Sequence, residues 1–204
     1  MKLKTLAKVC RKEGFFALYD KMDNDGKVVE QWLGCWGAVY VLPDLPHLTA
    51  EHIPRLFDLT AKQLGKITIK QQFLPENYNF DHDDKNESVC EREKMTIGYD
   101  GRILRPIMTK KGLELIDDDY LSPLDDVADE LGIYERRTES GRAYFALKVG
   151  FLVVGIIMPY DGIDEILVEE IEKMAFKSRK ALEAKVKRQK KTKEWLEDEM
   201  QDMQ

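Results

Sequence analysis

Three short turns of the same kind separate apolar segments, and they restrict the fold more than any other feature of the sequence. Each places a glycine after Asp or Ser and directly before a basic residue, at 25–27, 100–102 and 140–142. A glycine in this setting is typical of β-hairpins, because the turn needs positive φ angles that glycine adopts without strain. The chain is therefore predicted to build much of its sheet from antiparallel hairpins.

The first of these turns also has part of the spacing of a calcium-binding loop. With Gly26 at position 6 of such a loop, Asp23 and Asp25 occupy two of the ligand positions. The first and last ligand positions, however, hold Lys21 and Trp32. An ammonium group and an indole cannot supply the missing oxygen ligands, so the sequence predicts a hairpin turn and not a metal site.

Helix signals occur in three places. Residues 2–12 alternate apolar and basic side chains at helical spacing and stop before Gly14. Residues 50–64 have the same spacing and are followed by a glycine, so a single helix is predicted there. A third helix is predicted to begin at Ser122, which suits the N-cap position because proline and then acids follow in the first turn.

Two further segments are typical of strands. Residues 66–73 alternate apolar and polar side chains, as in a half-buried strand. Residues 149–158 form an almost uninterrupted apolar run, which we interpret as one central strand covered on both faces. Helices and hairpins alternate irregularly, so the predicted fold class is α+β: a mostly antiparallel sheet built from hairpins, with packed helices and a long C-terminal helix.

The length of the chain fits one domain with an appendage. It has 204 residues, 43% of them hydrophobic, and we predict an α+β globular body over 1–162 followed by a long helix over 163–204. The longest apolar run, 149–159, is about half of what a bilayer requires. The basic N-terminus is not followed by the apolar segment of a secretory signal. We therefore predict no membrane interaction.

The cysteines indicate the compartment. Cys10, Cys35 and Cys90 lie far apart and have no spacing typical of a zinc site, so neither a disulfide framework nor a thiolate metal centre is expected. A reduced, cytoplasmic location fits best. The sequence also lacks a glycine-rich phosphate loop, a dinucleotide fingerprint and a nucleophile elbow, so we predict no cofactor and do not favour an enzymatic activity.

The C-terminal segment has the most distinctive composition. Residues 163–204 contain neither Gly nor Pro, and Glu169 with Lys173 makes an i,i+4 pair of opposite charge. Residues 177–193 hold nine basic residues against one acid, a local charge of +8 in a chain of net charge −6. The basic residues predicted to contact a partner or nucleic acid are Lys177, Arg179, Lys180, Lys185, Lys187, Arg188, Lys190 and Lys191.

A basic helix with an apolar stripe suits three kinds of partner: an acidic protein, a second copy of the chain or a nucleic-acid backbone. A fully helical segment over 163–204 would reach about 60 Å at 1.5 Å per residue. The body has an expected radius of gyration of only about 15 Å. The helix must then overhang the body, pair with another chain or fray. The alternative interpretation is a solvated helix end, over which the acidic tip folds back.

Large aromatic residues cluster in the first hairpin region. Trp32, Trp36 and Tyr40 lie four residues apart, in or beside two adjoining predicted strands. They could form an exposed platform on which a nucleobase or a peptide stacks. The alternative is packing in the core across a hairpin, which is the more usual place for such side chains.

Residues 75–94 have no clear period and contain the candidates for metal ligands. Asp81, His82, Asp83 and Asp84 include the side-chain types that bind zinc or manganese. Contiguous side chains on a loop rarely converge on one ion, so no metal site is predicted. The alternative for this stretch is a mobile insertion, or a partner contact.

Five more acids occur at 117–119 and 125–126. Paired carboxylates can hold magnesium for phosphoryl chemistry. The acids at 81–84 or at 117–119, with His82, are therefore the basis of the alternative of a metal-dependent enzyme acting on phosphate esters. Acids in the first turn of a helix also offset the helix dipole. A solvated acidic edge is therefore the simpler interpretation.

The block QWLGCWGAVYVLPDLPHLT, followed by LFDLT, resembles uncharacterised accessory proteins of prophages and other mobile elements of Gram-positive bacteria. The resemblance lies within the first third of the chain and includes no catalytic motif, so it implies a genomic setting and no chemistry. We predict a non-enzymatic interaction or assembly protein that binds a protein partner or nucleic-acid backbone through its C-terminal helix. A further alternative is an acidic inhibitor-type protein of a mobile element, because acidic surface can occupy a partner's basic groove.

Overall fold

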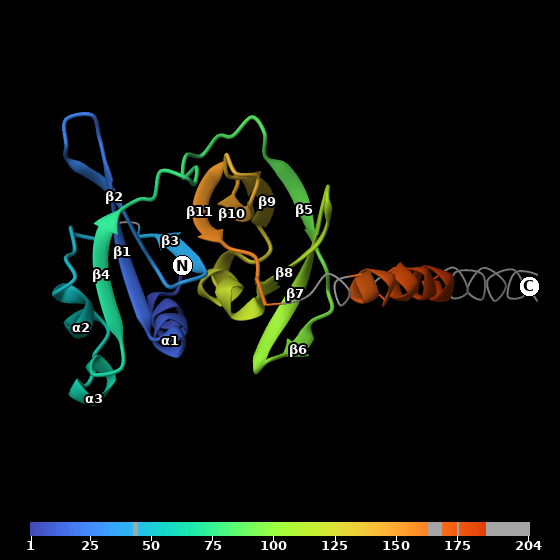
Figure 1. The fold of residues 1–204 in the computed structure, drawn as a ribbon, viewed down its shortest axis with the longest axis horizontal. Helices are drawn as coiled ribbons and strands as arrows, with labels where there is room; N and C mark the ends of the chain where they lie inside the picture. The colour runs from blue at the N-terminus through green and yellow to red at the C-terminus, as the bar shows by residue number, and fades with distance from the viewer. Residues whose placement is uncertain (43–44, 163–168, 175, 187–204) are drawn as a thin grey trace, which may run out of the picture. The chain divides into compact units, whose positions relative to one another are not determined.

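The computed structural model of the chain describes residues 1–42, 45–162, 169–174 and 176–186. The chain divides into two compact units, Met1–Asp161 and Gly162–Gln204. The fold class is α+β, as predicted: the first unit holds a large, mostly antiparallel sheet with few helices, and the second contributes a helix (Figure 1).

The sheet contains eleven strands in the described part of the chain. Along the sheet the order is β4 (Thr68–Phe73), β1 (Phe15–Met22), β2 (Val28–Gly34), β3 (Ala38–Val41), β11 (Leu152–Ile157), β10 (Ala143–Val149), β9 (Leu131–Arg137), β5 (Ser88–Arg92), β7 (Arg102–Thr109) and β6 (Ile97–Tyr99), with β8 (Gly112–Asp117) also paired to β7. The pair β1–β4 is parallel, and the other pairs between described strands are antiparallel.

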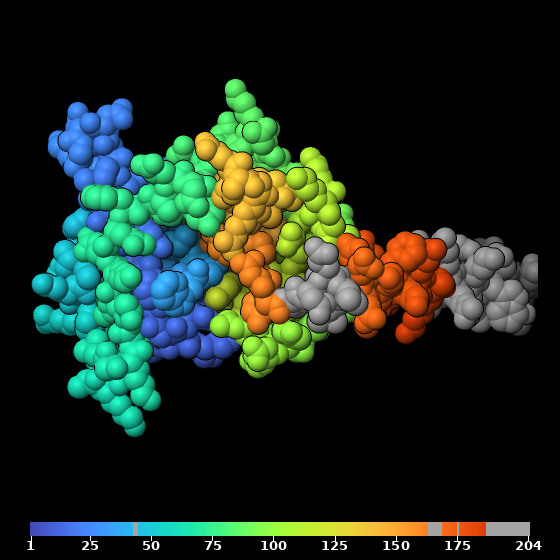
Figure 2. All heavy atoms as spheres, viewed as in Figure 1, coloured from blue at the N-terminus to red at the C-terminus, as the bar shows by residue number. Residues whose placement is uncertain are grey.

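All three predicted hairpins are confirmed, and they join β1 to β2, β6 to β7 and β9 to β10. In the first turn, Asp23 Oδ1 accepts hydrogen bonds of 2.9 Å from the N–H groups of Asp25 and Lys27. Gly26 has a φ of 74°, which explains the glycine there. The carboxylate of Asp23 therefore stabilises the backbone of the turn, in agreement with the predicted hairpin turn. The tip of this hairpin projects from the body, in blue in Figure 2.

The first predicted helix is confirmed, and the second prediction is wrong. Helix α1 (Leu3–Glu13) ends at Gly14, whose φ is 65°. The segment 50–64 holds two short helices, α2 (His52–Leu56) and α3 (Ala61–Leu64), instead of one. Thr60 and Gln63 form a capping box at the start of α3. Their side chains accept hydrogen bonds from backbone N–H groups that, in a continuous helix, would be bonded to carbonyls of the preceding turn.

The helix predicted after Ser122 is a 3-10 helix, η1 (Asp118–Val127), and it begins earlier. Asp117 takes the capping role, since its Oδ1 accepts from the N–H of Asp119 at 3.0 Å. The hydroxyl of Ser122 instead donates to the carbonyl of Asp119 at 2.6 Å. Asp117, six positions upstream of Pro123 and five upstream of Ser122, thus provides the cap.

The two predicted strand segments need smaller corrections. The apolar run 149–158 is not one strand, because Gly150 has a φ of 59° and turns the chain from β10 into β11. The part that forms β11 is central, with β3 on one side and β10 on the other. β4 is a strand as predicted, but it lies at the end of the sheet, and among its residues Ile69 alone is half-buried while the others are exposed.

The sheet has an apolar core on each face. In β10, Phe145 and Leu147 belong to one buried cluster, whereas Tyr144 and Ala146 belong to the other. This alternation is what the period of a strand covered on both sides requires. α1 and η1 pack together over the first cluster.

The second cluster is covered by residues 75–87, the first part of the stretch 75–94 that the sequence suggests as a mobile insertion; the rest of that stretch contains β5. Residues 75–87 are instead packed: Phe80 is buried against Trp32 with ring centroids 5.1 Å apart, and the ring of Tyr78 meets Tyr144 edge to face at 5.1 Å. The green atoms of the segment lie beside the orange β10–β11 hairpin in Figure 2. Aromatic side chains in an irregular stretch therefore form part of a core layer here.

Candidate functional site

Two of the three aromatic residues considered for a stacking platform lie in the core, which is the more usual place for such side chains. Trp32 and Tyr40 are both fully buried, because β2 and β3 are inner strands. The indole of Trp32 donates to Glu30 at 2.8 Å, and the hydroxyl of Tyr40 donates to the carbonyl of Tyr120. The core alternative holds for these two residues.

Trp36 differs from them, because it lies in the turn between β2 and β3 and is 66% exposed. Its ring stacks on Phe15 with centroids 3.8 Å apart and planes 12° apart. One face of the indole is thus covered by the protein, which leaves a single exposed aromatic ring where three were considered.

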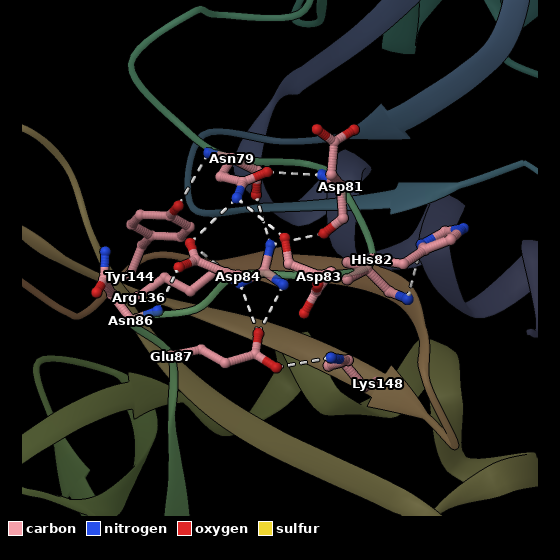
Figure 3. A network of polar contacts seen from close by, with 11 residues as sticks. Asn79, Asp81, His82, Asp83, Asp84, Asn86, Glu87, Arg136, Tyr144 and Lys148 are labelled. Carbon is pink, nitrogen blue, oxygen red and sulfur yellow. Dashed lines mark hydrogen bonds and ion pairs between the residues drawn. The ribbon is translucent and has the colours of Figure 1, made fainter.

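The weak metal candidates do not point toward one another (Figure 3). Asp81 accepts from Lys21 at 2.8 Å, and His82 Nδ1 accepts from the N–H of Val153 at 3.2 Å. Asp83 is exposed, and Asp84 accepts at 3.1 Å from the side chain of Asn79. Among the described residues, no group of three or more His, Cys, Asp or Glu side chains is arranged to hold a metal ion.

The same segment contributes to a buried ion pair that the sequence analysis missed (Figure 3). Arg136 is fully buried and donates to Glu87 at 2.6 and 2.9 Å. The same guanidinium donates to the backbone carbonyls of Asn79 at 2.9 Å and Asp81 at 2.8 Å. Lys148 donates to the other oxygen of Glu87 at 2.7 Å. The network therefore fastens residues 79–87 to β9 and β10.

One signal in the sequence could have revealed this network. Lys148 stands alone in the otherwise apolar stretch AYFALKVGFLVV. A cation placed in a buried strand needs a carboxylate partner, because an unpaired charge is costly to remove from water. The partner, Glu87, lies 61 residues away in the sequence, so spacing alone could not identify it.

Glu87 gives stability a pH dependence. Burial raises the pKa of this carboxyl, but the hydrogen bonds from Lys148 and Arg136 outweigh it and hold the pKa below its ordinary value of 4.5. A carboxyl with a lowered folded-state pKa stabilises the fold above its unfolded pKa and loses this contribution as the pH falls through the folded pKa. We expect the loss of unfolding free energy in Glu87→Gln to be largest at neutral pH and to shrink below pH 4.5.

Urea unfolding of the wild type and of Glu87→Gln, from neutral pH into the acid range, measures this difference. Glu91→Gln is the matched control, because Glu91 is an exposed glutamate of the neighbouring strand β5. Its effect should stay small at every pH. A penalty for Glu87→Gln that is the same at neutral and acid pH would contradict the ion-pair explanation.

The acids at 117–119 are also separated from one another. Asp117 accepts from Arg102 at 2.6 Å, Asp118 pairs with Arg105, and Asp119 accepts from Lys12 at 2.6 Å. Each carboxylate thus has its own cation. The clustered acids that a phosphate-ester enzyme would need are not brought together in this part of the described chain.

The second unit presents the predicted basic helix. Residues 169–174 and 176–186 are helical, and the predicted pair Lys173 and Glu169 lies at 3.3 Å. Four of the predicted contact residues are exposed on it: Lys177, Arg179, Lys180 and Lys185. The other four lie outside the described residues: Lys187, Arg188, Lys190 and Lys191. The ammonium of Lys180 sits 4.5 Å from the ring centroid of Phe176, one turn earlier.

Apolar side chains on this helix are exposed as well. Met174 is 56% exposed, Leu182 63% and Val186 51%. Positions 174, 178, 182 and 186 follow one another at intervals of four residues, so these three side chains and Ser178 form a single stripe. Arg179 and Lys185 flank the stripe, because they directly follow or precede its members. The candidate functional site is this stripe with its basic border.

No family model matches the chain, and neither the curated proteins nor the solved structures give a significant match. Within the described residues, no helix has both the length and the apolar character needed to cross a membrane.

Proposed function

We propose that this protein is a non-enzymatic interaction protein that binds a protein partner through the stripe on its C-terminal helix. The observation that carries the proposal is the exposure of Met174, Leu182 and Val186 on one face of that helix. An isolated helix of this length is marginal in water, and most helices are stabilised by packing their apolar face. A partner that covers the stripe supplies that packing.

The basic residues indicate the chemistry of the partner. Residues 177–193 carry a charge of +8 in a chain of net charge −6, so the remaining residues sum to −14. A partner with an apolar groove bordered by Asp and Glu complements the stripe and its flanking Arg179 and Lys185. A second copy of this chain has the required acidity and is the partner to test first.

Self-association is expected to depend on the stripe. Leu182→Glu places a carboxylate in the middle of it and should weaken association at least tenfold, because burying an unpaired charge is costly. Light scattering after size exclusion, on the full chain over a range of concentrations, gives the mass. Ala184→Glu is the control, since it adds the same charge on the opposite side of the helix.

Three results are informative. A dimer that Leu182→Glu dissociates and Ala184→Glu preserves supports the proposal. A dimer that both variants preserve places the interface elsewhere. A full chain that stays monomeric at every concentration overturns self-association, and the search then moves to acidic proteins as partners.

A second candidate function is binding to nucleic-acid backbone, favoured by the density of Lys and Arg over 177–193. Such binding would be insensitive to sequence and would weaken steeply with salt, because it releases counterions. Fluorescence anisotropy with random-sequence duplex DNA at increasing salt tests it. Leu182→Glu and Ala184→Glu should weaken DNA binding equally, because each adds one negative charge to the basic helix. A protein partner that covers the stripe should instead lose affinity for Leu182→Glu alone.

A further inference from the structure

The first unit contains a cavity of about 610 Å³ that neither the helix nor the predicted sites account for. Its walls come from β2, from the segment after β3, from η1 and from the β10–β11 hairpin. They are mostly aliphatic, and include Val29, Leu42, Leu124, Val127, Leu152 and Val153. A concave apolar site of this size lies within the range of small-molecule pockets, which is about 300–1,000 Å³.

Apolar side chains at the cavity are left in contact with water. Val29 is 59% exposed and Leu152 is 43% exposed, and both belong to the lining. Single exposed apolar residues are ordinary on protein surfaces. Two of them bordering one apolar cavity form a surface that a ligand with an apolar body would cover.

Most polar groups of the lining are already engaged. The side chain of Gln31 donates to Asp20 at 2.6 Å and exchanges two hydrogen bonds with the backbone of Leu48, at 2.7 and 2.9 Å. Glu30 accepts from the indole of Trp32 at 2.8 Å. The amide of Gln31 therefore has little hydrogen-bonding capacity left for a ligand, and Glu30 offers acceptors but no donor.

His82 is different, because it has a donor to offer. Its Nδ1 accepts from the N–H of Val153, so in the neutral imidazole the proton is carried by Nε2. Among the described residues, no hydrogen-bond acceptor is found for that N–H. His82 lines the cavity, and Figure 3 shows its ring turned away from the Arg136 network. The lining therefore presents an aliphatic wall with a free donor at His82, and a second imidazole, His47, whose Nε2 lies 3.8 Å from Asp20 Oδ1.

We propose that this cavity binds an uncharged, mainly aliphatic small molecule that carries one hydrogen-bond acceptor for His82 Nε2–H. Aliphatic walls disfavour the burial of any charge. The two charged groups of the lining, the carboxylate of Glu30 and the ammonium of Met1, already have partners in Lys21 at 4.0 Å and Asp126 at 2.8 Å, so neither requires a charged ligand. The site lies wholly within Met1–Asp161, so it is independent of the partner-binding function proposed for the helix.

The probe for the aliphatic wall is decan-2-one, titrated into the full chain by isothermal calorimetry. One-to-one, saturable binding is expected, and Leu152→Gln should weaken it about tenfold. Leu64→Gln is the matched control, because Leu64 is 39% exposed, close to the 43% of Leu152, and does not line the cavity. Thermal unfolding of both variants shows that they are folded.

The head group is tested with His82→Asn and with charged probes. In His82→Asn, the amide oxygen can accept from the N–H of Val153 in place of Nδ1, but no donor remains at the position of Nε2. Decan-2-one should therefore bind about fivefold more weakly, which corresponds to the loss of one hydrogen bond. Decanoate and decyltrimethylammonium should bind more weakly than decan-2-one. Absence of saturable binding, equal affinity in Leu152→Gln, or tighter binding of either charged probe overturns the proposal.

Discussion

Arg136→Met is expected to lower the free energy of unfolding by about 3–5 kcal/mol, one of the two largest single-residue effects that we expect in this chain. The substitution keeps most of the volume of a fully buried side chain but removes its charge and its donors. Glu87 is then left with Lys148 alone, and the carbonyls of Asn79 and Asp81 lose their hydrogen bonds in the interior. Unsatisfied buried groups of this kind are costly.

An exposed arginine provides the control. Arg142 lies directly before β10, and its side chain is exposed and pairs with the exposed Asp161. Arg142→Met should cost about 1 kcal/mol or less, because exposed ion pairs contribute little to stability. Urea unfolding measures both penalties, and hydrogen exchange should show faster exchange over residues 75–87 in Arg136→Met alone. Equal penalties for the two variants would show that burial of Arg136 does not matter.

Gly34→Ala is expected to destabilise the fold by about 3 kcal/mol or more, because this position has no room for a methyl group. A Cβ on residue 34 would lie 2.0 Å from the carbonyl oxygen of Ala38 and 2.5 Å from the Cα of Val39. Both are backbone atoms, and the N–H of Cys35 holds the same carbonyl in a 2.7 Å hydrogen bond. The turn between β2 and β3 must open to admit the methyl group.

Calorimetry should show this as a fall of roughly 6–12 °C in the unfolding midpoint for a chain of this size. Gly98→Ala is the matched variant, since Gly98 also lies in a strand, β6, but a Cβ there would meet no atom within 4 Å. Its midpoint should change by no more than about 2 °C. A Gly34→Ala variant as stable as Gly98→Ala would mean that the turn adapts at little cost.

Local signals in the sequence predicted local structure well. The three hairpins were predictable because glycine after Asp or Ser reports a backbone conformation within two residues. The prediction of one helix over 50–64 failed because the apolar spacing continues through residues 57–60, where the helix is interrupted. The capping box of Thr60 and Gln63 determines where the second helix begins. That box was visible in the sequence but competed with the stronger periodic pattern.

The candidate site was predictable in part for the same reason. The exposed basic residues Lys177 to Lys185 follow from composition along one helix. Trp32 and Tyr40 could not be assigned to the core until the order of the strands was known. Side chains alternate between the two faces in every strand, so the sequence pattern does not tell an edge strand from a central one. The pairing of Glu87 with Arg136 joins segments 49 residues apart, which no short motif encodes.

The pairing of β3 with β11 has a consequence for how the protein is made. Residues 38–41 find their second neighbour only in residues 155–157, near the end of the first unit. During synthesis from the N-terminus, the hairpin strands β1 to β3 can assemble early, yet β3 keeps an open edge until almost the whole unit has left the ribosome. An unpaired strand edge is a template for wrong partners. The last strand of the unit, β11, therefore closes this edge, and we expect the yield of folded protein to depend on its synthesis.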